Sequence, residues 1–129
     1  MRVIAIIPAR GGSKRLPRKN IFPLNGKPLM AYTIDACKES KFINEIYVSS
    51  DDQEILDVAI VYGAKTITRP AELADDKTPK VIAIRQAVNS PEVQADGESD
   101  IVIIPQANSP QITAAQMDGA IQMMLDHNL

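Results

Sequence analysis

Short apolar runs alternate with amphipathic segments along this chain, and the alternation predicts its secondary structure. Runs rich in branched apolar residues predict four strands, at residues 3–7, 46–50, 65–68 and 100–105. The segments between and after them carry apolar residues at helical spacing, at residues 28–40, 51–63, 80–88 and 117–125. Strands that alternate with helices favour a parallel sheet with right-handed crossovers, so the pattern predicts an α/β layered domain.

Helix-start signals support the predicted helices. Pro28 suits the first turn of the first helix, because its missing N–H needs no partner there. Ser50 with Gln53, and Thr113 with Gln116, have the spacing of a capping box. The sequence therefore predicts helix starts near these pairs.

Composition limits the class of protein. The 129 residues predict a single domain over residues 1–129, and 45% of them are apolar. No apolar run is long enough to cross a bilayer, so we expect no membrane partner. Cys37, the lone cysteine, excludes an internal disulfide and favours the reducing cytoplasm.

Charge is distributed unevenly, although the net charge is only −2. The residues before Asp35 include no acid and seven bases: Arg2, Arg10, Lys14, Arg15, Arg18, Lys19 and Lys27. A cationic segment on an acidic body concentrates small anions without making the whole surface positive. Nucleic acid is the competing anion, but aromatic residues make up 4% of the chain and the basic segment has none, which disfavours base stacking.

The segment "IPARGGSKRLPRKN", residues 7–20, follows the first predicted strand. In parallel sheets ligands bind beyond the carboxyl ends of the strands, and the segments 49–52 and 105–110 follow two other strands. Neither the G-x-x-x-x-G-K-[ST] nor the G-x-G-x-x-G motif is present. Adjacent glycines at 11 and 12 nevertheless allow backbone N–H groups to turn toward an anion. A solvated basic turn is the alternative, and the position of the segment favours a polyphosphate site.

Five motifs then indicate a family: "IPARGGSKRLPRKNI", "LNGKPL", "VSSDDQEI", "YGAKTITRPAELADD" and "PQANSP". Together they resemble the acylneuraminate cytidylyltransferases, which are the CMP-sialic acid synthetases and bacterial relatives acting on other nine-carbon acidic sugars. The resemblance runs from residue 3 to about residue 125. It implies a Rossmann-like nucleotidyltransferase fold with a mostly parallel sheet. Family members continue further, so the C-terminal part of the family fold, with its metal-binding aspartates and much of the sugar pocket, is expected to be absent here.

The resemblance also implies the reaction and the residues that carry it. Family members join CTP to the acidic sugar with Mg²⁺, and release pyrophosphate. Matching positions imply nucleotide-binding roles for Arg10, Gly11, Ser13, Lys14, Lys19, Asn20 and Arg69. Among these Arg10 and Lys19 are the expected catalytic residues, and Gln106 matches the residue placed near the sugar. The segment "QANSPQIT" departs from the family's "QPTSPLRT", which has an arginine at the position of Ile112.

The other polar residues receive structural interpretations. Asp51 and Asp52 at a helix start favour capping over metal binding, and Asp75–Asp76 is expected to be peripheral, so the metal ligands stay unidentified. We expect Cys37 in the core and His127 in solvent. The methionine-rich last helix predicts a homo-oligomer.

Three functions follow from these observations. The leading hypothesis is a cytidylyltransferase that transfers CMP from CTP to a nine-carbon acidic sugar of the sialic or pseudaminic acid type. The alternative is a non-catalytic nucleotide-binding or dimerising remnant of such an enzyme. A nucleic-acid-binding basic loop is the least favoured.

Overall fold

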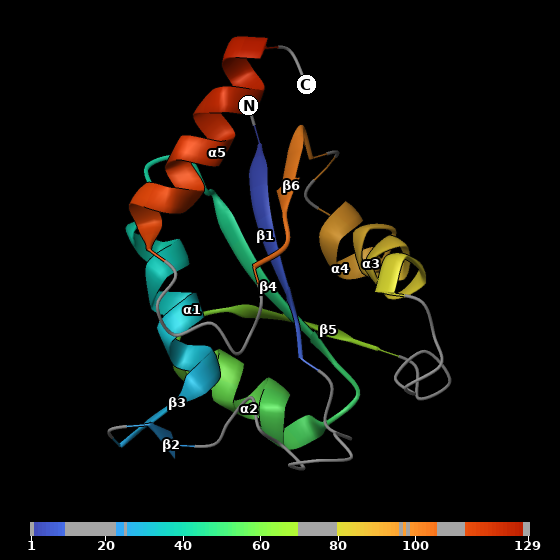
Figure 1. Cartoon of the computed structure of the whole chain (residues 1–129). Coiled ribbons are helices and arrows are strands. Elements are labelled where there is room, and N and C mark those ends of the chain that lie inside the picture. Colours follow the sequence, from blue (N-terminus) through green and yellow to red (C-terminus); the bar gives the residue numbers. More distant parts are fainter. Residues whose placement is uncertain are drawn as a thin grey trace.

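A parallel sheet forms the centre of the molecule in the computed structural model, which describes residues 2–9, 23–24, 26–69, 80–95, 97, 99–105 and 113–127. Its strands are β1 (Val3–Pro8), β4 (Glu45–Ser50), β5 (Lys65–Thr68) and β6 (Ile101–Ile103). Within the described residues their order is β5-β4-β1-β6, and every neighbouring pair is parallel (Figure 1). All four predicted strands are confirmed, with ends that differ by at most two residues.

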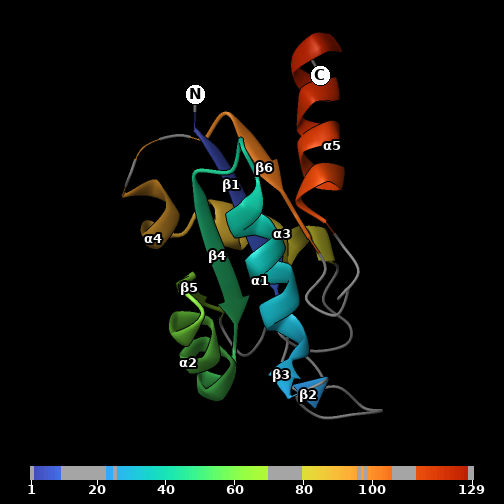
Figure 2. The same ribbon diagram turned by 90° about the vertical axis from the view of Figure 1, so that its left-hand side faces the viewer.

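Helices cover both faces of this sheet (Figures 1 and 2). One face carries α1 (Leu29–Glu39), α2 (Gln53–Val61) and α5 (Ala114–His127). The other face carries α3 (Lys80–Val88) and α4 (Pro91–Gln94). The sequence predicted α3 but not the short α4. The resulting three layers confirm the predicted α/β class.

Burial on both faces explains the composition of β1. Ala5 and Ile7 pack into the cluster beneath α1 and α2, whereas Ile4 and Ile6 pack toward α3 and α4. A strand with helices on both sides needs apolar residues at every position, so it shows no apolar–polar alternation. The unbroken run at residues 3–7 is the result.

A small antiparallel hairpin, β2 (Pro23–Leu24) and β3 (Lys27–Pro28), precedes α1 and was not predicted. Gly26 turns the chain with a φ of 79°, a conformation that glycine adopts without strain. Pro28 precedes the first helical residue as the N-cap of α1, one position earlier than the sequence predicted.

Two predicted capping boxes have different outcomes. The Thr113–Gln116 box is confirmed: Thr113 N–H donates to Gln116 Oε1 over 3.0 Å, and Gln116 N–H donates to Thr113 Oγ1 over 3.1 Å. The Ser50–Gln53 box is wrong, because α2 begins later. Asp52 is its N-cap, and its Oδ1 accepts from Glu54 N–H over 2.9 Å.

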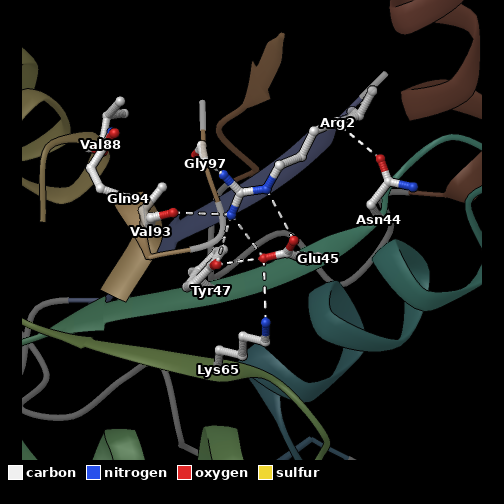
Figure 3. Close-up of polar contacts among 10 residues, drawn as sticks. Arg2, Asn44, Glu45, Tyr47, Lys65, Val88, Val93, Gln94 and Gly97 are labelled. Carbon is white, nitrogen blue, oxygen red and sulfur yellow. Dashed lines mark hydrogen bonds and ion pairs between the residues drawn. The ribbon is translucent and has the colours of Figure 1, made fainter. Parts of the chain in front are cut away.

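The amino ends of the strands are joined by one charged group (Figure 3). Arg2 Nε and Nη2 donate to the two carboxylate oxygens of Glu45, each over 3.0 Å. Arg2 Nη2 also donates to Tyr47 Oη and to the carbonyl of Val93, each over 3.1 Å. The Arg2 guanidinium therefore ties the start of β1 to β4 and α4.

Among the described helices, none combines the length and hydropathy that a membrane crossing requires.

Candidate functional site

The carboxyl ends of β1, β4 and β5 meet at one edge of the sheet (Figure 1). Pro8 lies opposite Ser49 in the ladder, and Ser50 lies opposite Thr68. The ladder extends one residue further on each side, since Ala9 N–H donates to Ser49 O over 2.9 Å and Arg69 N–H to Ser50 O over 2.8 Å. The last described residues of these three strands therefore lie side by side at this edge, where the predicted site is expected.

Arg69 is the predicted site residue that the structure describes. It comes two positions after Ile67, so strand alternation places it on the face that α3 and α4 cover. The residue is 7% exposed, which is unusual for an arginine. A buried guanidinium is stabilised by acceptors with fixed geometry, and it is well suited to phosphate or carbonyl oxygens of a ligand. Arg69 therefore contributes a buried cation to the carboxyl edge.

Ser49 is a buried polar residue that the sequence analysis did not single out. It is 1% exposed, and its hydroxyl has no hydrogen-bond partner among the described residues. The neighbouring Ser50 differs, because its Oγ accepts from the backbone N–H of Asp52 over 3.0 Å. The signal in the sequence was a pair of serines at the end of an otherwise apolar strand.

Most predicted ligand contacts lie outside the described residues: Arg10, Gly11, Ser13, Lys14, Lys19, Asn20 and Gln106. Their roles stay predictions. The structure does place the points where their segments leave the sheet. Residues 10–20 follow Ala9 at the end of β1, and Gln106 follows the buried Pro105 after β6. Because β1 and β6 are neighbours in the sheet, the two segments begin on adjacent strands.

Metal ligands are not assembled in the part of the chain that the structure describes. There, no three His, Cys, Asp or Glu side chains are grouped as a metal ion would require. Asp52 caps α2, which agrees with the expectation that the carboxylates at this helix start favour capping over metal binding, and the neighbouring Asp51 is exposed. Asp75 and Asp76 lie outside the described ranges.

Cys37 is a core residue, as predicted. It is 1% exposed, and its Sγ lies 3.8 Å from the Sδ of Met117 on α5. Burial raises the pKa of the Cys37 thiol to about 12, because the charged thiolate would lose its hydration. The thiol therefore stays protonated and helps to pack α5 against α1. His127, at the end of α5, is exposed, as expected.

These features define a class: an α/β domain with a candidate ligand site at the carboxyl edge of its sheet. The sequence profile of the cytidylyltransferase family matches residues 4–129, and the chain belongs to this family. The mostly parallel nucleotidyltransferase sheet that the resemblance implied is thereby confirmed.

The chain is similar to two named bacterial relatives and to one solved structure. The chain is 49% identical over 89 residues to a pseudaminic acid cytidylyltransferase of Campylobacter jejuni, covering 68% of this chain and 38% of that protein. It is 43% identical over 111 residues to a CMP-N,N'-diacetyllegionaminic acid synthase of Legionella pneumophila, covering 85% and 47%. A solved structure of a CMP:2-keto-3-deoxy-manno-octonic acid synthetase in complex with CTP superposes with a TM-score of 0.79 at 26% identity, covering 98% of this chain and 48% of that one. The chain thus spans less than half the length of each of these proteins.

Proposed function

We propose that this protein transfers CMP from CTP to a nine-carbon acidic sugar of the pseudaminic or sialic acid type. The observation that carries the proposal is the buried Arg69 at the carboxyl edge of the sheet. It follows β5, and β4 alone separates β5 from β1, after which the basic segment 10–20 begins. Family membership and the names of the relatives support the choice of nucleotide and sugar.

The proposed reaction is a displacement at phosphorus. The anomeric hydroxyl of the sugar attacks the α-phosphorus of CTP and loses its proton to solvent. The bond between that phosphorus and the oxygen that bridges it to the β-phosphate breaks. Pyrophosphate leaves, and the CMP-sugar remains. Negative charge grows on the phosphate oxygens and the leaving group, so the protein acts chiefly by positioning and electrostatic stabilisation.

Each predicted residue has a part in this proposal. Arg10 and Lys19 stabilise the charge that develops on the reacting phosphates. The triphosphate is held by Gly11, Ser13 and Lys14, and Asn20 lies near the ribose. Arg69 contacts the nucleotide from the edge of β5, and Gln106 contacts the sugar.

We propose Mg²⁺ as the cofactor, since the cation neutralises charge on triphosphate oxygens when it is bound. The described residues do not form a protein site for it, since no three His, Cys, Asp or Glu side chains are grouped there. Asp52 Oδ1 accepts the capping hydrogen bond of α2. No step above depends on a protein-bound metal. We also propose a cytoplasmic location, which the lone Cys37 supports. We further propose a homo-oligomer, which the 60% exposed side chain of Met123 on α5 supports.

Calorimetric titration tests the nucleotide part of the proposal. CTP is expected to bind more tightly than GTP, and a short oligonucleotide is expected not to bind. Arg69→Ala should weaken CTP binding by about 1.5–3 kcal/mol, the range for hydrogen bonds to charged groups. Arg85→Ala is the matched control, because Arg85 is an exposed arginine of α3. Unchanged CTP affinity in a folded Arg69→Ala variant would refute the assignment.

Pyrophosphate release tests the reaction itself. The wild-type protein is incubated with CTP, Mg²⁺ and each member of a panel of nine-carbon acidic sugars. The proposal expects release with at least one sugar of the pseudaminic or sialic type. CTP binding without release would support the non-catalytic alternative.

A further inference from the structure

The Ser49 side chain lies among apolar neighbours at the carboxyl edge of the sheet. Its strand, β4, runs between β1 and β5 (Figure 1), and Ser49 lies opposite Pro8 on one side and Ile67 on the other. Residues directly opposite each other in neighbouring strands present their side chains to the same face of the sheet. The cross-strand neighbours of the hydroxyl are therefore a proline ring and an isoleucine, and neither side chain can form a hydrogen bond with it.

The burial of this hydroxyl distinguishes Ser49 from a serine with a structural role. Ser49 is 1% exposed, and its Oγ has no hydrogen-bond partner among the described residues. A buried hydroxyl without a partner destabilises a protein, and the few in native structures call for an explanation such as a ligand, an ion or a water. Ser90 shows the ordinary arrangement, since it is 3% exposed and its Oγ donates to Ala87 O over 2.6 Å.

Arg69 adds a second polar group to the same face of the sheet. It lies two residues beyond Ile67, the partner of Ser49 in the ladder, and it is 7% exposed. Its backbone N–H donates to Ser50 O, so the chain still follows the end of β4 at this point. A hydroxyl and a guanidinium thus lie on neighbouring strands with apolar side chains beside them. Apolar surroundings with a few fixed polar groups are typical of sites for small molecules.

The cytosine ring is the part of CTP that fits these surroundings best. Its two faces are apolar, and its edge carries hydrogen-bond donors and acceptors. A charged triphosphate would lose its hydration among apolar side chains, which is costly. A serine hydroxyl both donates and accepts, so it can pair with either kind of group on the edge of the ring. The planar guanidinium of Arg69 is suited to an aromatic ring as well.

We propose that Ser49 is a nucleotide-binding residue, whose Oγ forms a hydrogen bond with the edge of the cytosine ring of CTP. The proposal rests on the function proposed above, and it adds a neutral group to the charged Arg69 at the same edge. Because Ser49 is 1% exposed, the ring reaches the hydroxyl by displacing the side chains that cover it.

Calorimetry with three ligands tests the inference. These are CTP, cytidine, which lacks the phosphates, and inorganic triphosphate, which lacks the nucleoside; cytidine is measured by its displacement of CTP. Ser49→Ala should weaken the binding of CTP and of cytidine by about fivefold each, the effect of one lost neutral hydrogen bond, and leave triphosphate binding unchanged. Urea denaturation of the same variant should show no loss of stability.

Ser90→Ala is the matched control, because it removes a buried hydroxyl that has a protein partner. It should lose stability and keep all three affinities, as a structural serine does. Where Ser49→Ala does not fold, Ser49→Cys decides the question, since a thiol is a weaker hydrogen-bonding group and should weaken CTP binding in the same direction.

Two results overturn the inference alone: unchanged CTP affinity in the folded Ser49 variant, or a loss of affinity that inorganic triphosphate shares. Failure of wild type to bind CTP overturns the proposed function and the inference together.

Discussion

Two adjacent serines at the end of β4 have opposite environments. Ser50 Oγ accepts a backbone hydrogen bond that orders the start of α2, whereas the Ser49 hydroxyl is buried without a partner among the described residues. A buried hydroxyl that finds no partner destabilises the folded state, and a satisfied one stabilises it. The two side chains therefore invite opposite predictions.

Ser49→Ala is expected to leave the free energy of unfolding unchanged or to raise it by up to about 1 kcal/mol. Ser50→Ala is expected to lower it by about 0.5–1.5 kcal/mol, because the Asp52 N–H loses its acceptor. Urea denaturation of the two variants beside wild type measures both values. A loss of more than 1 kcal/mol in Ser49→Ala would show that its hydroxyl has a structural partner.

Glu45 links stability to pH. Hydrogen bonding from Arg2 is the main reason that the pKa of Glu45 falls from 4.5 to about 2. A carboxylate with a lowered pKa in the folded state contributes stability above its unfolded pKa and loses it as the pH falls toward its folded pKa. As the pH falls from 4.5 to about 2, the free energy of unfolding of wild type should therefore decrease because Glu45 is protonated. Glu45→Gln has no carboxylate at this position, so this contribution to its stability does not change with pH. At pH 7, Glu45→Gln should be less stable by about 1–3 kcal/mol.

Denaturation at several pH values measures this difference. The gap between wild type and Glu45→Gln should narrow as the pH is lowered through the stated interval. A constant gap would contradict the role of the Arg2–Glu45 pair. Lys65, whose Nζ donates to Glu45 Oε2 over 3.3 Å, is more exposed and should contribute less.

At the scale of elements, two glycines are present for different reasons: Gly63 has a backbone conformation that other residues rarely adopt, whereas Gly119 lies in an ordinary helix. Gly63 ends α2 with a φ of 91°, and an added Cβ would come within 2.7 Å of Lys38 Nζ. Gly119 lies within α5, and an added Cβ there would meet nothing within 4 Å. The first position favours glycine, whereas the second only lowers the helix propensity.

Gly119→Ala is therefore expected to raise the free energy of unfolding by about 0.5–1 kcal/mol. Gly63→Ala should lower it by about 1–2 kcal/mol, because alanine is strained at positive φ. Thermal denaturation of both variants gives the two signs directly. Gly97→Ala, at a φ of 96° with open space around it, isolates the backbone strain from the contact with Lys38.

At the scale of the whole molecule, the proposed reaction divides the ligand between two segments. Residues 10–20 follow β1 and carry the groups assigned to CTP, whereas Gln106 follows β6 and is assigned to the sugar. Gln106→Ala should weaken sugar binding by about 1 kcal/mol, the scale of one neutral hydrogen bond, and leave CTP affinity nearly intact. Competition binding with a CMP-sugar and with CTP measures the two effects. A loss confined to CTP would place Gln106 at the nucleotide instead.

The sequence by itself determined the strands of the main sheet, the four longer helices and the α/β class. Every described strand of the main sheet overlaps a predicted run. The signal is clearest in β1, because burial on both faces demands unbroken apolar residues there. The Thr113–Gln116 box was also readable, since both of its hydrogen bonds are local. The family motifs indicated the cytidylyltransferases, and the family profile confirmed them.

The tertiary structure decided what depends on contacts between distant residues. The strand order, the depth of Arg69 and the different surroundings of Ser49 and Ser50 follow from how helices pack on the sheet, which local periodicity does not encode. The start of α2 also escaped prediction, because Ser50 stayed in β4 and Asp52 took the cap. In the sequence, Lys27 is one of seven bases before Asp35, with no partner indicated. In the folded protein its ammonium group lies next to Asp35, Tyr32 and Tyr62, because tertiary packing determines which groups surround a charge.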